Sequence, residues 1–438
     1  MKKCFLLLVH VVFSFFLLTA QDYLPFKQIR SYTATQKPNK YDSSLKYLTN
    51  RLGFELHYLY PLYQAIGWED KFKKLLGERR YYDNFSQLIS FTGDYAMASA
   101  YIEKTFKPLS DSAIKSIEAG VSQLKNIQYA SAKNSILSVA QYYQVIMLNE
   151  AHAKPVHRAF TYSLLDGLYQ QGYHYLAMET FNNYPNHCLD SLNVFTGYYT
   201  NEPIGGELVR KALQLGYKLV SYEDTSVQEH TGSQRDSSQA MNIYSVIKKD
   251  PSAKILVHAG YGHICEEKMG DYIPMGWWFK KISGIDPFTV DQTGMTEGSD
   301  FEFGRLFYNY FTEKFTITEP SVVFENKRPF NPLHENGYDM IIIHPPANYQ
   351  NNRPSWISLN GERKPVLIQP TEKGLFFVQA YYENEYNEEM VNVLIPADQT
   401  YIMTRDGYYC LYLRKGKYKI VLRDITYKVL SVKDREVN

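Results

Sequence analysis

Several ionisable side chains follow short apolar stretches at points where a buried strand would end. The segment YQVIMLNEAH places Glu150 and His152 directly after an apolar run. YHYLAME ends with Glu179, and KILVHAGYGH ends with His263. A carboxylate at the edge of an apolar run needs a partner to remain ionised, and Arg158, one turn into the next expected helix, is placed to supply one. This order of residues favours a functional cluster over scattered structural polar groups.

The segment AGYGH, residues 259–263, supplies a second signal. Its two glycines flank Tyr261 directly after the expected strand, and glycine lets a backbone turn sharply and approach a ligand. The turn is expected to bring His263 back over the strand end. His258 falls at the end of the same strand and is counted as a supporting residue.

Two kinds of chemistry fit this cluster, and both use water. In the first, His152 is a general base, Glu150 or Glu179 holds its tautomer, and His263 or Arg158 stabilises an oxyanion. No G-x-S-x-G segment supplies a serine nucleophile. In the second, a divalent metal is bound by His152, His263 and one or both of Glu150 and Glu179, and it lowers the pKa of a bound water. The same residues serve both, so both remain open.

Other residues of the right types are interpreted as ordinary structural groups. Three that end strands are expected to serve as turn residues or helix caps: Asp224, Asp291 and His344. The isolated histidines are expected to be satisfied polar groups: His157, His174, His187 and His230.

Short apolar strands alternate with helices over residues 141–350, and these elements must position the cluster. The expected strands end at Glu150, Glu179, Glu223–Asp224, His258, Asp291 and His344. Alternation of this kind predicts parallel βαβ units, that is, an α/β fold with an open, mostly parallel sheet and helices on both faces. Ligands bind at the carboxyl ends of such strands, so we expect the ionisable residues to converge on one edge.

Two further regions flank the expected core. Residues 21–140 are predicted to be helical from apolar spacing. Residues 351–438 carry short candidate strands separated by Gly, Asn and Asp turns: VLIQP, GLFFVQAYY, MVNVLIP, TYIMT, YYCLYL and YKIVLRD. This pattern predicts a small all-β, sandwich-like domain, available to contact a protein or glycan partner.

Residues 1–20 have the pattern of a secretory signal. Lys2 and Lys3 precede an apolar stretch, and Ala20 is a small residue at a plausible cleavage point. The apolar stretch is too short for a comfortable membrane span. The sequence therefore predicts export to the periplasm or the extracellular space, with no transmembrane segment once the signal is removed.

The rest of the composition excludes some partners. Without Lys2 and Lys3, 45 of the 47 basic residues remain against 46 acidic ones, so nothing indicates a nucleic-acid partner. The remaining cysteines are widely spaced and odd in number: Cys188, Cys265 and Cys410. A disulfide framework is therefore not expected, although a single bridge is compatible with the sequence.

The ordered segments NEAH, GYHYLAMET, SQRDSSQAMNI and KILVHAGYGH resemble the core of the superfamily that joins erythromycin esterase, the haem-binding protein ChaN and the Tiki/TraB proteins. The resemblance covers roughly residues 142–300. It implies a site of Glu150, His152, Glu179 and His263, supported by Arg158 and Arg235. The single residue between Glu150 and His152 is more similar to ChaN and Tiki than to the esterases. Asn149 departs from the usual glycine.

The resemblance implies two functions. The first is hydrolysis of an ester or amide bond in a small-molecule or peptide substrate, either metal-free or metal-assisted as in the Tiki proteases. The second is binding of haem or metal in iron uptake without catalysis, as in ChaN, with Tyr261 and His263 available to a haem face. We favour the hydrolase on the sequence.

Overall fold

The computed structural model describes residues 23–35, 59–183, 189–226, 230–299, 301–332, 337–401 and 407–438. The expected signal segment, His187 and Cys188 lie outside these residues. Cys265 and Cys410 are both buried free thiols. Within the described ranges, no helix combines the length and apolar character needed to cross a membrane.

A six-stranded parallel sheet forms the centre of the described structure, in the order β4-β3-β5-β2-β6-β9. Its strands are β2 (Val145–Glu150), β3 (Tyr173–Met178), β4 (Lys218–Ser221), β5 (Lys254–Gly260), β6 (Phe288–Asp291) and β9 (Met340–Ile341). The central strand β2 is buried along its whole length, as expected of a parallel strand covered on both faces. The predicted fold class is confirmed.

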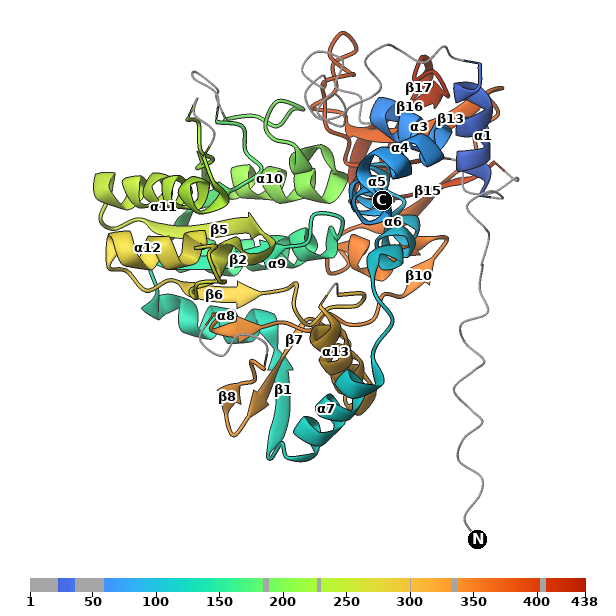
Figure 1. The fold of residues 1–438 in the computed structure, drawn as a ribbon. Helices are drawn as coiled ribbons and strands as arrows, with labels where there is room; N and C mark the ends of the chain where they lie inside the picture. The colour runs from blue at the N-terminus through green and yellow to red at the C-terminus, as the bar shows by residue number, and fades with distance from the viewer. Residues whose placement is uncertain are drawn as a thin grey trace.

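Helices cover both faces of this sheet (Figure 1). Ile146 and Leu148 of β2 pack on one side with α8 (Ala132–Val139), α9 (Val156–Gln170) and α10 (Pro203–Leu215). Val145 and Met147 pack on the other side with α11 (Gly232–Lys249) and α12 (Met275–Ser283). The alternation of side chains along each strand therefore divides the core into two layers.

A smaller antiparallel sheet contains β1 (Ile127–Ser131), β7 (Ser321–Glu325) and β8 (Arg328–Pro329), and it packs with α7 (Asp111–Ser122) and α13 (Glu302–Lys314). The prediction of a helical region over residues 21–140 was wrong at β1. Its partner β7 lies far later in the chain, and a pairing over that separation leaves no local signal.

Two antiparallel sheets form the C-terminal region, in the orders β14-β13-β16-β17 and β12-β15. The strands are β12 (Lys364–Ile368), β13 (Leu375–Tyr382), β14 (Asp398–Tyr401), β15 (Tyr409–Leu413), β16 (Gly416–Asp424) and β17 (Val429–Val437). Val366, Val378 and Leu411 belong to one buried cluster shared by both sheets. Sandwich-like packing follows from this shared core.

One expectation for this region was wrong, and one strand was not predicted. The segment MVNVLIP, residues 390–396, forms turns rather than a strand. Val391 and Ile395 are buried nonetheless, and Arg210 of α10 donates to the carbonyl of Ile395, so the apolar run reflects docking rather than a strand ladder. The strand β17 was missed because most of its residues are exposed and many are charged, as is common at a sheet edge.

The N-terminal helices pack against the C-terminal strands (Figure 1). They are α1 (Leu24–Thr33), α3 (Leu59–Gly67), α4 (Glu69–Leu76), α5 (Glu78–Phe91) and α6 (Tyr95–Ile102). Phe376, Phe377 and Tyr401 of the β region belong to the same buried cluster as these helices. Short elements complete the description: η2 (Glu103–Thr105), η3 (Ala140–Tyr142), η4 (Tyr199–Asn201), η5 (Tyr261–Ile264), η6 (Ser355–Ser358), β10 (Tyr349–Gln350) and β11 (Arg353–Pro354).

Candidate active site

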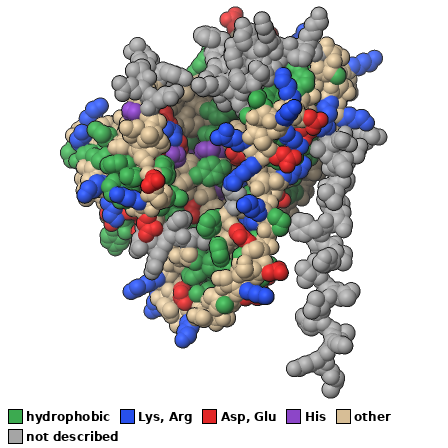
Figure 2. Space-filling model, viewed as in Figure 1, with side chains coloured by type: hydrophobic (Ala, Val, Ile, Leu, Met, Phe, Trp, Pro, Cys, Tyr) green, Lys and Arg blue, Asp and Glu red, His purple; other side chains and the backbone are tan. Residues whose placement is uncertain are grey.

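The carboxyl ends of β2, β3 and β5 bring the predicted residues to one edge of the sheet. Glu150 is level with Gly260 across β2 and β5, and Met178, which precedes Glu179, is level with His258. Histidine side chains are visible in a hollow between the α/β core and the N-terminal helices (Figure 2). The expected convergence at the strand ends is therefore observed.

The Glu150 carboxylate is buried and is held by Arg158 and two histidines. Nε of Arg158 lies 2.6 Å from Oε2, and Nη2 donates to Oε1 at 2.8 Å. Nε2 of His258 lies 2.9 Å from Oε2, and Nδ1 of His152 lies 3.3 Å from Oε1. Burial alone would raise the pKa of Glu150, but the charge of Arg158 and the histidine hydrogen bonds outweigh burial and hold the pKa well below its usual range.

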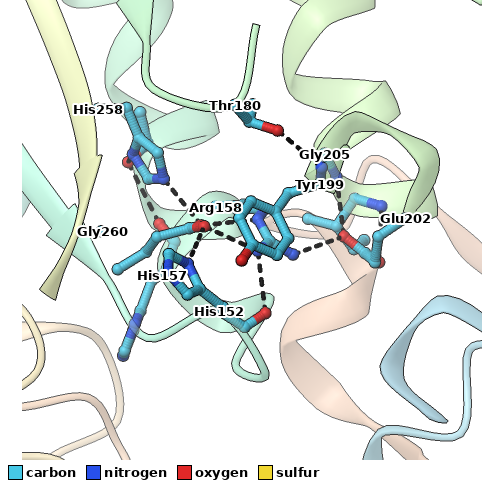
Figure 3. Close-up of polar contacts among 12 residues, drawn as sticks. His152, His157, Arg158, Thr180, Tyr199, Glu202, Gly205, His258 and Gly260 are labelled. Carbon is cyan, nitrogen blue, oxygen red and sulfur yellow. Dashed lines mark hydrogen bonds and ion pairs between the residues drawn. The ribbon is translucent and has the colours of Figure 1, made fainter. Parts of the chain in front are cut away.

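His152 has the surroundings that a general base requires. Its ring stacks on Tyr199 with centroids 4.3 Å apart (Figure 3). It also meets the ring of Tyr261 edge-on, with centroids 4.9 Å apart. Because the ionised Glu150 can only accept, Nδ1 of the neutral ring carries the proton and Nε2 keeps its lone pair. Nε2 forms no hydrogen bond with any described residue, and the side chain is 20% exposed. Nε2 is thus available to a water molecule.

Gly260 lies between His152 and Glu179. A Cβ atom at this position would lie 2.4 Å from Cε1 of His152 and 3.1 Å from Oε2 of Glu179. The N–H of Gly260 donates to the same Oε2 atom at 2.6 Å. The absent side chain therefore leaves the space in which the imidazole and the second carboxylate approach each other.

Arg235, at the start of α11, joins two carboxylates. It donates from Nη2 to Glu179 at 2.6 Å and from Nε to Glu223 at 2.8 Å. Burial would raise the pKa of Glu179, but His263 and Arg235 outweigh it and lower the pKa. The Arg235 side chain is 34% exposed, so part of its guanidinium remains accessible to a ligand.

His263 is oriented by two residues that the sequence did not single out. Its Nδ1 lies 2.8 Å from Oδ2 of Asp236, which also accepts from the hydroxyl of Tyr272 at 2.6 Å. Its Nε2 lies 3.6 Å from Oε1 of Glu179. Burial would lower the pKa of His263, but Asp236 and Glu179 outweigh it and raise the pKa above its ordinary value. His263 therefore retains a proton more readily than a free histidine.

The expected metal ligands do not fit a divalent cation in this arrangement. The oxygens of Glu150 bind Arg158 and the histidines, and those of Glu179 bind Arg235 and a backbone N–H. A cation would have to displace a guanidinium from each of these carboxylates. Over the residues that the structure describes, no group of three or more His, Cys, Asp or Glu side chains could hold a metal ion.

Asn149 stands where the resembled family has glycine, and its side chain hydrogen-bonds to the turn that follows β5. Its Nδ2 donates to the carbonyl of Tyr261 and to Oδ1 of Asp291, each at 2.7 Å. Tyr261 has φ of 40°, a left-handed conformation that this bond helps to hold. Asp291 also accepts from the N–H of Gly294 at 3.0 Å, as a turn residue does. The departure from glycine therefore has a structural reason.

Several of the residues interpreted as structural have partners within the protein. His157 accepts the N–H of Ala151 at 2.9 Å and so fixes the turn before His152. His344 is buried beside His157, with ring centroids 5.2 Å apart. Asp224 and His230 form a pair at 2.6 Å near the start of α11.

Sequence reasoning missed four residues that contact the cluster: Tyr199, Glu202, Asp236 and Tyr272. Asp236 could have been found, because it adjoins Arg235 at the start of an expected helix. Tyr199 and Glu202 belong to the connection between β3 and α10, where no regular spacing gives a signal.

Comparisons with known proteins add little. No family model matches the sequence, and no curated protein matches it. The type III effector HopBA1 aligns with 50% of this chain and 96% of its own, at 12% identity and a TM-score of 0.31. RRSP, a MARTX toxin effector domain from Vibrio vulnificus, aligns over 62% of each chain, at 14% identity and a TM-score of 0.29. Scores this low carry no argument about fold or function.

Proposed function

We propose that the protein is an exported hydrolase that cleaves an ester or amide bond in a small-molecule or peptide substrate. One observation carries the proposal: two carboxylate–histidine pairs, Glu150–His152 and Asp236–His263, lie near a third carboxylate. Both histidines are close enough to Glu179 to lower its pKa. A histidine with a free nitrogen and a second histidine that favours its protonated form supply a base and an acid on the two sides of Glu179.

The proposed reaction uses water as the nucleophile. Nε2 of His152 takes a proton from water, and the hydroxide oxygen bonds to the carbonyl carbon of the substrate. The oxyanion is stabilised by Arg235, which is partly exposed, whereas Arg158 is fully buried behind Glu150. The bond to the leaving group then breaks, and the departing oxygen or nitrogen takes a proton from His263. Solvent returns the proton from His152 to His263.

The order and spacing of these residues also support a place in the superfamily of erythromycin esterase, ChaN and Tiki/TraB proteins. We propose this relationship from Glu150, His152, Glu179, Arg235 and His263 alone. The parallel sheet with ligand-facing strand ends is compatible with it.

Haem binding without catalysis is a second candidate, and one observation favours it. Tyr261 is 41% exposed, and its ring lies 4.9 Å from that of His152, so an exposed aromatic ring lies beside a partly exposed imidazole. A haem titration that gives a Soret band, lost in Tyr261→Phe or His263→Gln, would favour this alternative.

Hydrolysis is tested with purified protein on nitrophenyl esters, fluorogenic aminoacyl amides and a labelled protein substrate, with and without a chelator. His152→Gln and His263→Gln are expected to lower kcat/KM by about a hundredfold or more. His230→Gln is the matched control, because His230 pairs with Asp224 outside the cluster. Full activity of His152→Gln would contradict the proposal. Activity lost on chelation and restored by metal would contradict the metal-free route.

A further inference from the structure

A buried chain of polar contacts connects the N-terminal helices to the candidate base. The hydroxyl of Tyr95, at the start of α6, donates to Oε1 of Glu202 at 2.6 Å. Oε2 of Glu202 lies 3.5 Å from Nη1 of Arg158 (Figure 3). The other nitrogens of Arg158 hold Glu150, which binds His152. A tyrosine of the N-terminal region is thus connected to the imidazole through three charged side chains.

Each member of this chain between Tyr95 and Glu150 is at most 3% exposed. Water therefore cannot replace a lost hydrogen bond or ion pair in this series. Displacement of one of these side chains shifts the side chain that it contacts. Burial raises the pKa of Glu202, and the donors Arg158 and Tyr95 only partly offset this effect. The Tyr95 hydroxyl therefore helps to keep Glu202 charged opposite Arg158.

Glu202 is also the N-cap of α10, where it accepts from the N–H groups of Ile204 and Gly205, each at 2.9 Å. A cap alone is usually made by Ser, Thr, Asp or Asn, whose short side chains suffice. The two cap bonds fix the Glu202 carboxylate to a rigid helix end. This anchor holds Nη1 of Arg158 in place, while Nε and Nη2 face Glu150.

Arg158 is confined further by its own neighbours. Its Nη2 donates to the carbonyl of His152 at 3.0 Å. Its Cζ lies 5.1 Å from the ring centroid of Tyr199, the ring on which His152 stacks. The guanidinium therefore touches the backbone, the carboxylate partner and the stacking partner of the candidate base. A small shift of Arg158 changes all three.

We infer that Tyr95 and Glu202 are positioning residues for the reaction proposed above: they hold Arg158, and through it Glu150 and His152, in the geometry that activates water. The inference rests on the proposed function. It also gives the N-terminal helices a role in the active site, because α6 supplies Tyr95, where the series of polar contacts begins.

The kinetic test compares two Tyr→Phe variants on the same helix. Tyr95→Phe removes the hydroxyl that binds Glu202, whereas Tyr101→Phe removes a buried hydroxyl that forms no hydrogen bond with any described residue. Tyr95→Phe is expected to lower kcat about tenfold with KM within about twofold, and Tyr101→Phe to match the unaltered protein. Glu202→Gln, which retains a cap acceptor but loses the charge, is expected to lower kcat more strongly. Equal kcat in the two tyrosine variants would overturn the inference.

A second measurement does not depend on turnover. Ring signals of isotope-labelled histidines are recorded by NMR, with His152→Gln assigning the His152 signal. Tyr95→Phe is expected to move that signal, and Tyr101→Phe to leave it in place. An unmoved signal in Tyr95→Phe would overturn the inference even if the protein hydrolyses esters. A moved signal in a protein without hydrolase activity would uphold the positioning and refute the proposed function.

Discussion

Nε2 of His258 lies 2.9 Å from Oε2 of Glu150, so one buried carboxylate holds two histidines. The other ring nitrogen of His258 lies 3.0 Å from the hydroxyl of Thr161, and the side chain is only 3% exposed. Both nitrogens of His258 are therefore used within the protein. Of the two, only His152 has a ring nitrogen without a hydrogen bond to any described residue, which is why His258 is assigned to supporting Glu150 and His152 to the chemistry.

Glu150→Gln is predicted to destabilise the protein by about 3–5 kcal/mol, because Arg158 would keep its charge in a buried site without this partner. The pKa of Glu150 is lowered in the folded state. The contribution of Glu150 to stability is therefore present above the pKa of the unfolded state, about 4.3, and is lost as the pH falls through the lower pKa of the folded state. Urea unfolding should show the largest difference in unfolding free energy between the unaltered protein and Glu150→Gln at pH 7, and a smaller difference below about pH 4. A difference that does not change with pH would contradict this assignment.

Glu118→Gln is the matched control for that experiment. Glu118 is exposed on α7, and its loss is expected to change stability by no more than about 0.5 kcal/mol at either pH.

His344→Gln is predicted to reduce the sensitivity of folding to acid. Burial, with a smaller effect from Lys154, lowers the pKa of His344 to about 3. In the unfolded chain the pKa of His344 is about 6.5, so the unfolded state binds a proton at a higher pH than the folded state does. Stability therefore falls as the pH drops from about 6.5 toward 3. Between pH 6.5 and 5, the unaltered protein should lose about 2 kcal/mol more than the variant. Parallel stability curves for the two proteins would show that His344 is not a source of this sensitivity.

The sheet edge could be predicted from the sequence because its signals are local. Each apolar run of a parallel strand ends at a polar residue, and the carboxyl ends of parallel strands must share an edge. Glu150, Glu179 and His263 followed from that rule. Asp236 was within reach for a related reason, since it adjoins Arg235 on the same helix.

The supports of the site could not be predicted, because they come from remote segments. Tyr95 meets Glu202 across 107 residues of the chain, and β1 meets β7 across a still longer separation. Contacts of this kind are fixed by how whole elements pack, and they impose no spacing on neighbouring residues. Tyr199 was missed likewise, because it lies in an irregular connection.

Gly260→Ala is predicted to impair hydrolysis strongly while leaving the fold intact. The backbone φ at Gly260 is −79°, which alanine adopts without strain, so folding is not at risk from the backbone. The added Cβ would lie 2.9 Å from Nε2 of His152, and Tyr199 and Tyr261 restrict the ring from moving aside. A loss of about a hundredfold in kcat/KM is expected with little change in the thermal midpoint.

Gly262→Ala supplies the control for the same turn. Its Cβ would first meet Sδ of Met269 at 3.4 Å, a flexible side chain, so activity should persist. Equal activity in the two alanine variants would refute the placement of His152.

Asp236→Asn is predicted to lower the pKa of His263. Burial alone lowers that pKa, and the hydrogen bond to Asp236 is the largest of the effects that raise it instead, followed by the charges of Glu179 and Asp236. A raised histidine pKa stabilises the fold below about pH 6.5, and that stability is lost as the pH rises through the folded value. Asp236→Asn should therefore be most destabilised in acid, and the difference in unfolding free energy between it and the unaltered protein should decrease at higher pH. Tyr272→Phe keeps the Asp236 charge, so NMR titration should show a smaller decrease for it, and equal decreases would assign the effect to the hydroxyl instead.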